Sequence, residues 1–429
     1  MGTKATKIRL FEFKTPAMRA FHVTWVAFFL CFFGWFGVAP LMPVIRKELA
    51  LTQEQIGNLL IASVAATVLA RLGIGVLCDR FGPRRVYAGL LAVGALPVMG
   101  IGLADDYVTF LGFRLAISMI GASFVITQYH TSAMFAPNVV GTANATTAGW
   151  GNLGGGVTQI VMPLVFAGLV GAGLTEAASW RVAMIVPGAL MLLAAVAYLT
   201  LTQDGPHGNG PVPGGSGKGK GGFGAAVRDP RVWVVALAYG ACFGVELTVH
   251  NIAAMYFHDQ FALDLKTAGL VAGSFGVLAL FARSLGGYLG DIAGRKLALR
   301  GRSLLLAALL LGEGLTLALF SQMGNLAIAI AVLLVFGLFT HGAAGATYSV
   351  VPFLRPKTVG AVAGIVGAGG NVGAVAAGML FRSEDLKAPA ALAILGVAVT
   401  ISGLLVLAVQ LLAAREPDAA LSPAPAPAE

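Results

Sequence analysis

Long apolar segments, separated by short polar ones, run through nearly the whole chain of 429 residues. A helix needs about 20 mostly apolar residues to cross the hydrocarbon core of a bilayer. Twelve segments meet this requirement, and they are residues 20–42, 53–78, 84–103, 107–133, 139–171, 178–202, 231–258, 266–290, 300–320, 324–352, 358–381 and 387–414. The fifth is long for one straight span, which leaves room for a bend. The pattern predicts an all-α membrane protein with twelve transmembrane helices.

Two segments lack this apolar character. Residues 203–230 are rich in Gly, Pro and Lys, a composition typical of a flexible cytoplasmic linker. Residues 415–429 are rich in Pro and Ala, which predicts a disordered tail. We therefore expect an N-terminal six-helix half at 1–202 and a C-terminal six-helix half at 231–414.

The composition supports the membrane interpretation. Hydrophobic residues make up 57% of the chain and charged residues 11%, whereas soluble domains average about 25% charged residues. The three cysteines, Cys31, Cys78 and Cys242, lie in or beside apolar segments, and their spacing suits neither a zinc site nor a disulfide framework. There is no phosphate-binding loop and no nucleophile–base set. We expect no metal, no cofactor and no enzymatic activity.

The net charge of +9 does not indicate nucleic-acid binding, because the basic residues lie in short loops rather than in a patch with interleaved aromatics. More than half of the 28 lysines and arginines fall in the N-terminal segment and the even-numbered connections. This asymmetry predicts that both termini are cytoplasmic. We expect the first apolar segment to remain as a span in the inner membrane rather than to be a cleaved signal peptide.

Two loops repeat one pattern. Residues 75–85 and 287–296, after the second and eighth predicted helices, both fit G-x-x-x-D-x-x-G-[x]-R-[RK]. The pattern resembles the loop signature of the major facilitator superfamily. The resemblance implies two pseudo-symmetric halves with the substrate between them near the midplane. It also implies a gating role for the charged loop residues, which are Asp79, Arg80, Asp291 and Arg295.

Two arginines lie inside predicted helices at equivalent places in the two halves. Arg71 and Arg283 each precede the loop aspartate by eight residues, which is about 12 Å along a helix and close to the midplane. An arginine there should face a cavity and a partner. The membrane carboxylates are Glu246 and Glu313. Pairing with one of them is one interpretation, but neither is clearly placed to neutralise both arginines. We therefore predict an anionic substrate, which a guanidinium can bind through two parallel hydrogen bonds.

The fifth and eleventh predicted helices are rich in glycine. Residues 148–159 and 367–373 each contain one Asn among glycines at GxxxG spacing. Such spacing allows close helix packing and leaves room for a small ligand. The candidate substrate contacts in these runs are Gly151, Asn152, Gly370 and Asn371.

These runs, with residues 124–130, 242–248 and 345–353, resemble the nitrate/nitrite porter family. The resemblance implies that two arginines hold nitrate while aromatic rings cover its faces. The matching positions are Arg71, Arg283, Phe124 and Phe243, with Tyr239 one turn before Phe243. Nitrate, with nitrite as the close competitor, becomes the expected cargo, and a monomer the expected functional unit. Another small anion remains an alternative.

Import of an anion works against a negative-inside membrane potential, at about 2.3 kcal/mol per charge and 100 mV. Nitrate/proton symport would offset this cost, and nitrate/nitrite exchange would avoid it. Glu246 and His250 are four residues apart on one helix face, and titratable groups at such depth commonly mark proton routes. We favour symport with these two residues as proton-coupling candidates; the alternative is that Glu246 is the structural partner of an arginine.

Overall fold

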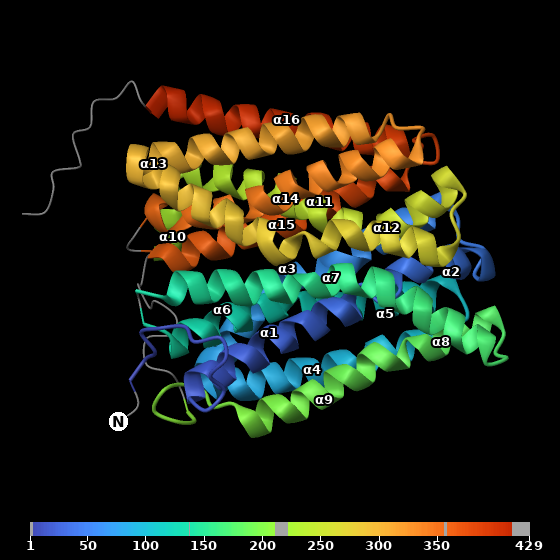
Figure 1. The fold of residues 1–429 in the computed structure, drawn as a ribbon, viewed down its shortest axis with the longest axis horizontal. Coiled ribbons are helices and arrows are strands. Elements are labelled where there is room, and N and C mark those ends of the chain that lie inside the picture. The colour runs from blue at the N-terminus through green and yellow to red at the C-terminus, as the bar shows by residue number, and fades with distance from the viewer. Residues whose placement is uncertain (1–2, 137, 211–221, 356–357, 414–429) are drawn as a thin grey trace, which may run out of the picture.

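The structure is a computed structural model that describes residues 3–136, 138–210, 222–355 and 358–413. Within these ranges the chain forms helices and two isolated β-bridges. The helices run roughly along one direction in an elongated bundle (Figure 1). The glycine-rich part of the predicted linker and the predicted disordered tail lie outside the described residues.

Six spans precede the linker. The first is built from α1 (Pro16–Trp35), η1 (Ala39–Leu41) and α2 (Met42–Glu48). The next five are α3 (Gln53–Phe81); α4 (Pro83–Gly100) with η2 (Ile101–Leu103); α5 (Tyr107–Ser118), η3 (Met119–Ala122) and α6 (Ser123–Met134); α7 (Val140–Gly171); and α8 (Glu176–Ala183) with α9 (Ile185–Leu201). Helix α3 bends by 43° between Arg71 and Gly73.

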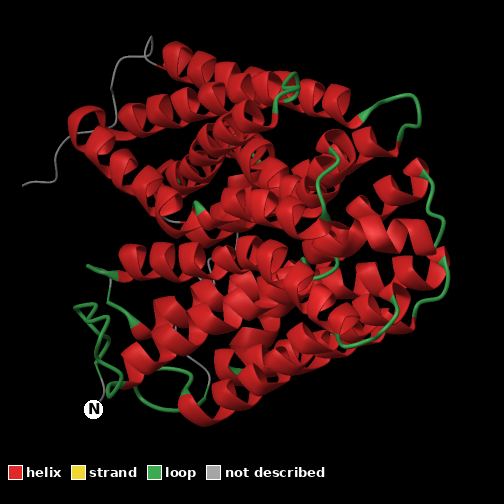
Figure 2. Ribbon diagram, turned by 45° about the vertical axis from the view of Figure 1, so that its right-hand side comes forward, coloured by secondary structure: helices red, strands yellow, loops and turns green. Residues whose placement is uncertain are grey.

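The second set follows a short helix, α10 (Gly222–Val227), in the linker. Its helices are α11 (Pro230–Phe261), α12 (Leu265–Val277), α13 (Ala279–Phe320), α14 (Leu326–Leu354), α15 (Val359–Arg382) and α16 (Ala388–Ala413). In Figure 1 this set occupies the upper part of the bundle and α1–α9 the lower part. The turned view of Figure 2 shows the helices joined by short loops, with no strand drawn in the described residues.

Helix α13 is a hairpin of two arms. Its backbone leaves the helical region at Leu297 and Ala298. A methyl group built on Gly290 would lie 4.0 Å from the Leu305 side chain, although fifteen residues of straight helix would separate the two by about 22 Å. The first arm, 279–296, therefore continues the span that α12 begins, and the second arm, 299–320, is the next span.

The predicted number of spans follows from this hairpin. Among the described residues ten segments are long and apolar enough to cross a bilayer, and the bent α3 makes eleven. Leu265–Phe320 counts once in that number, with 56 residues. Dividing it at the break in α13 gives the twelve spans predicted from hydropathy.

Close glycine contacts join the helices. A methyl group on Gly156 of α7 would lie 2.6 Å from the backbone of Gly276 in α12, which belongs to the other set of helices. A methyl group on Gly244 of α11 would likewise lie 2.7 Å from the backbone of Gly373 in α15. These glycines allow backbones to approach without intervening side chains, as small residues do at membrane helix interfaces.

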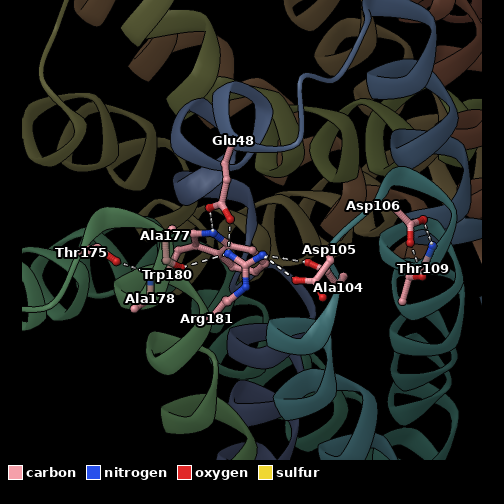
Figure 3. Close-up of polar contacts among 10 residues, drawn as sticks. All are labelled: Glu48, Ala104, Asp105, Asp106, Thr109, Thr175, Ala177, Ala178, Trp180 and Arg181. Carbon is pink, nitrogen blue, oxygen red and sulfur yellow. Dashed lines mark hydrogen bonds and ion pairs between the residues drawn. The ribbon is translucent and has the colours of Figure 1, made fainter.

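A polar cluster fixes one end of the lower set, at α2 and α8 (Figure 3). Arg181 of α8 donates to Glu48 of α2 and, at 3.1 Å and 3.2 Å, to Ala104 O and Asp105 Oδ1. Trp180 Nε1 donates to the same Glu48 carboxylate at 2.5 Å. We call this end of the bundle the α2/α8 end, and the opposite one the α10 end.

Helix α5 begins beside this cluster with a side-chain cap. Asp106 accepts a hydrogen bond from the backbone N–H of Thr109 at 2.9 Å and another from the Thr109 hydroxyl at 2.9 Å. The backbone bond, followed by the hydroxyl bond, lowers the pKa of Asp106. A charged aspartate at this position also interacts favourably with the positive end of the helix dipole.

Candidate functional site

Two arginines from different halves of the chain meet at one aromatic ring. Arg71 lies on α3, and its Cζ is 6.0 Å from the centroid of the Phe243 ring. Arg283 lies on the first arm of α13, and its Cζ is 5.6 Å from the same centroid. A guanidinium within about 6 Å of a ring centroid is attracted to the negative face of the ring. The structure therefore brings together the two arginines that the repeat pattern singles out.

Further aromatic rings surround this meeting point. Tyr239 stacks on Phe243 with centroids 5.0 Å apart, and Tyr348 meets Tyr239 edge-on at 5.2 Å. Phe124 lies 5.9 Å from Tyr348 and 5.5 Å from Arg71 Cζ. We call Arg71, Arg283, Phe124, Tyr239, Phe243 and Tyr348 the central cluster. Tyr348 was not among the residues predicted for the site, although it lies in one of the segments that resemble the porter family.

Arg283 has an acidic partner. Both side chains are buried, and Arg283 Nη2 donates to Glu246 of α11. Asn152 of α7 completes the contact: with its amide oxygen turned to the guanidinium, it accepts from Nη1 at 2.8 Å and from Nη2 at 2.9 Å. Glu246 therefore neutralises Arg283, which matches the alternative that Glu246 is the structural partner of one arginine, but it does not pair with Arg71.

Arg71 differs from Arg283 in its partners. Its Nη1 donates to Gly367 O at 2.8 Å and its Nε to Gly121 O at 3.5 Å, and both acceptors are neutral carbonyl oxygens. No ion pair of Arg71 occurs within the described part of the chain. With two guanidinium groups and one carboxylate, the region of the central cluster keeps one uncompensated positive charge.

His341 of α14, rather than the predicted His250, meets the Glu246 carboxylate. Its Nδ1 is 3.6 Å from Glu246 Oε2, and its Nε2 is 3.1 Å from the carbonyl oxygen of Phe275. A carbonyl only accepts, so Nε2 carries the hydrogen and a neutral His341 turns a lone pair toward the carboxylate. A proton shared between His341 and Glu246 would satisfy both atoms.

His250 lies one turn beyond Glu246 on α11, within electrostatic reach of the carboxylate, and its ring packs against aromatic neighbours. Its ring packs between Phe36, at 5.1 Å, and Phe275, at 5.6 Å, and among the described residues neither of its ring nitrogens has a hydrogen-bond partner. A methyl group on Gly155 would lie 3.1 Å from the ring. His250 therefore fills space where α7, α11 and α12 meet.

The glycine-rich helices support the central cluster in unequal ways. A methyl group on Gly370 would lie 2.7 Å from the Phe243 ring. The lack of a side chain at Gly370 therefore allows the stacked rings of Tyr239 and Phe243 to pack against α15. Gly151 instead packs on Phe28, whose ring centroid is 5.9 Å from that of Phe124. Phe28 therefore lies between Gly151 and the central cluster. Asn371 Nδ2 donates to Gly367 O at 3.3 Å, the carbonyl that Arg71 also uses.

The charged loop residues lie toward the α10 end. Tyr129 donates to Asp79 at 3.1 Å, and Arg80 lies 5.2 Å over the ring of Phe81. Asp291 accepts from Arg302 at 2.6 Å, because the hairpin in α13 folds Arg302 back beside it. The same guanidinium donates to Ser349 O of α14 at 3.2 Å.

Polar contacts join the two halves at the α2/α8 end and deeper in the bundle. Arg46 donates to both carboxylate oxygens of Asp259, at 2.6 Å and 2.7 Å. Arg382 pairs with Glu54. The buried Arg114 donates to Asn251 at 2.7 Å. We call these six residues the latch.

Comparison with known proteins places the chain in a family. The sequence profile of the Major Facilitator Superfamily matches residues 24–378. The "High affinity nitrate transporter 2.5" of Arabidopsis thaliana is 44% identical over 383 residues, which cover 88% of this chain and 76% of that protein. The chain belongs to the nitrate/nitrite porter family of the major facilitator superfamily. The family prediction is confirmed, and this porter is a transporter rather than an enzyme.

Other similarities extend over nearly the whole porter. The "Nitrate/nitrite transporter NrtP" of Nostoc punctiforme is 29% identical over 469 residues and covers 92% of each chain. Among solved structures, an inward-facing, unoccupied bacterial homologue of the human lysosomal transporter Spinster matches 94% of this chain and 98% of its own, with a TM-score of 0.70 and 18% identity. That likeness concerns the fold, and it confirms the predicted major facilitator architecture of this multi-pass membrane protein.

Proposed function

We propose that this porter imports nitrate across the cytoplasmic membrane by alternating access and couples nitrate entry to protons. The observation that carries the proposal is Arg71, a guanidinium at the centre of the bundle beside aromatic faces and without a carboxylate partner among the described residues. The relatives named as nitrate transporters support the choice of anion. Nitrite is the second substrate that this chemistry admits.

The donors of the central cluster suit a small planar anion. A methyl group built on Gly367 would lie 3.6 Å from Arg71 Nη1 and 3.6 Å from the Tyr348 hydroxyl, so the two donors converge on one place. The Tyr348 hydroxyl is buried and has no hydrogen-bond partner within the described chain. Nitrate can accept from both groups through its edge, while Phe124 and Phe243 cover its weakly hydrated faces.

The latch supplies a gate for alternating access. It binds the halves 1–202 and 231–414 to each other at the α2/α8 end. We assign this end to the outside and the α10 end, with both termini, to the cytoplasm, in keeping with the Lys and Arg distribution. Opening of the outer side then requires the Arg46–Asp259 and Glu54–Arg382 pairs to separate, as the two halves rock about the central cluster.

Proton coupling follows from the count of charges. With Glu246 ionised, Arg283 is already neutralised and only Arg71 is available to an anion. When Glu246 and His341 take up a proton, Arg283 loses its ionic partner and both guanidinium groups can bind nitrate. Proton binding and nitrate binding thus strengthen each other, as linkage requires. One proton per nitrate also removes the electrical cost of moving the anion inward.

Purified porter in liposomes tests the mechanism. With no nitrite inside, an acid step outside should drive nitrate into the liposomes. Nitrate entry that requires internal nitrite and ignores the pH step would establish exchange and contradict symport. Competition by nitrite, chlorate and small organic acids at the same site measures how strictly the porter selects nitrate.

Replacing Tyr348 with phenylalanine should raise the KM for nitrate about fivefold, the effect of losing about 1 kcal/mol of hydrogen bonding. The ring and its packing remain, so the maximal rate should change less. Tyr256→Phe is the matched control, because its hydroxyl is also buried without a partner but lies among Phe257, Phe261 and Phe320, outside the central cluster. Equal KM values for Tyr348→Phe and the wild type would remove Tyr348 from the site.

A further inference from the structure

A second buried carboxyl group lies within electrostatic reach of Glu246. Glu313 lies on the second arm of α13 with 0% of its side chain exposed. Neither of its oxygens has a hydrogen-bond partner in the described chain. It faces Thr340 of α14 and is near Glu246 and Cys242 of α11. The function proposed above makes no use of it.

The hydrogen bond of Thr340 determines which form of Glu313 fits. The Thr340 hydroxyl donates to Phe336 O at 3.0 Å, so its oxygen can only accept from a further neighbour. A carboxylate also only accepts, whereas a protonated carboxyl group can donate to that oxygen. Geometry therefore favours a neutral Glu313 that carries a proton.

The charged groups around Glu313 also favour its neutral, protonated form. Glu246 on α11 is a like charge, and its own cation, Arg283, is already bound to it. On α14, His341 follows Thr340 and faces Glu246. The described residues of α16, which pack against Gly314, include no titratable side chain. A buried carboxylate with one anionic neighbour and no cation of its own is strongly disfavoured.

We propose that Glu313 is a further proton-binding residue of this porter, which holds a proton beside Glu246 and exchanges it with Glu246 during transport. The inference rests on the proposed symport. In the exchange step an O–H bond of Glu313 breaks and one forms on Glu246. The negative charge passes from Glu246 to Glu313, so that Arg283 is released as the anion arrives. Glu246 then releases its proton to the cytoplasmic side, and Glu313 takes up a new proton from the more acidic outer solution, so that one proton crosses with each nitrate.

Infrared difference spectroscopy on the purified porter tests the protonated state directly. Glu313→Gln keeps the shape and the donor but cannot ionise. The carbonyl stretch of a protonated, buried carboxyl group should be present in the wild type and absent in Glu313→Gln. Glu176→Gln, at the exposed start of α8, is the control and should retain the band. A wild type without this band, or a band that persists in Glu313→Gln, overturns the proposal.

Transport by the same variants tests the role of that proton. In liposomes, Glu313→Gln should keep nitrate–nitrate exchange within about twofold of the wild type, while net uptake driven by a pH step falls at least about tenfold. Equal pH-driven uptake by both proteins overturns the role of Glu313 alone. Loss of exchange together with net uptake shows a structural residue and also overturns it. Wild-type uptake that ignores pH instead contradicts the symport itself.

Discussion

Replacing Arg71 with lysine should lower nitrate uptake at least about tenfold, the scale of one lost interaction of 1.4 kcal/mol. The arginine uses Nη1 for Gly367 O and Nε for Gly121 O, and its planar group lies against Phe124 and Phe243. A lysine has one compact ammonium group, so it cannot hold this position and also present a flat pair of donors to an anion. The initial rate of pH-driven uptake at low nitrate concentration measures the loss.

The control for this substitution is Arg231→Lys. Arg231 lies in the first turn of α11, is half exposed and pairs with Asp229 outside the central cluster. Its replacement should leave uptake within about twofold of the wild type, because lysine keeps the positive charge beside Asp229 and the pair lies away from the central cluster. Both variants should show the same elution volume and thermal stability as the wild type. Unchanged uptake in Arg71→Lys would place Arg71 outside the binding site and remove the main support for an anionic cargo.

Hydropathy located the spans because the bilayer requires each of them to be helical. A chain that crosses hydrocarbon must satisfy its backbone within a helix, so apolar length alone predicts where helices lie. It does not predict how they end or break. Residues 291–299 were expected to form a loop, but the helix continues to the break at Leu297 and Ala298. The residues of that segment are compatible with helix, and only the hairpin contacts of Gly290 and Asp291 place the turn.

The site was predictable to the extent that the internal repeat relates one half to the other. Arg71 and Arg283 occupy matching positions in the repeat, and the structure brings both to the Phe243 ring. The partners of each arginine differ, however, because they depend on helix rotation and on residues from other helices. Spacing along α11 placed His250 on the face of Glu246, whereas contact across the bundle brings His341 to the carboxylate.

Glutamine at position 246 should abolish pH-driven accumulation of nitrate while nitrate binding persists. Glu246 is the anion that competes with nitrate for Arg283. In the wild type, protonation of Glu246 removes this competitor, so nitrate should bind more tightly as the pH falls. Glutamine removes the competitor at every pH, so affinity should be high and nearly independent of pH. Accumulation should fall at least about tenfold, because proton binding no longer controls the anion site.

Thermal stability separates this role of Glu246 from a merely structural one. Removing one partner of a buried ion pair costs about 3–5 kcal/mol, since the other charge is left uncompensated. Glu246→Gln should therefore unfold at a lower temperature than the wild type, although Asn152 still accepts from Arg283. Nitrate should restore much of this loss, because a bound anion replaces the missing carboxylate and stabilises the state that binds it. A larger nitrate-dependent rise in Tm for Glu246→Gln than for the wild type is the expected result. Equal rises would mean that nitrate does not reach Arg283, and the exchange of one anion for another at that guanidinium would then be wrong.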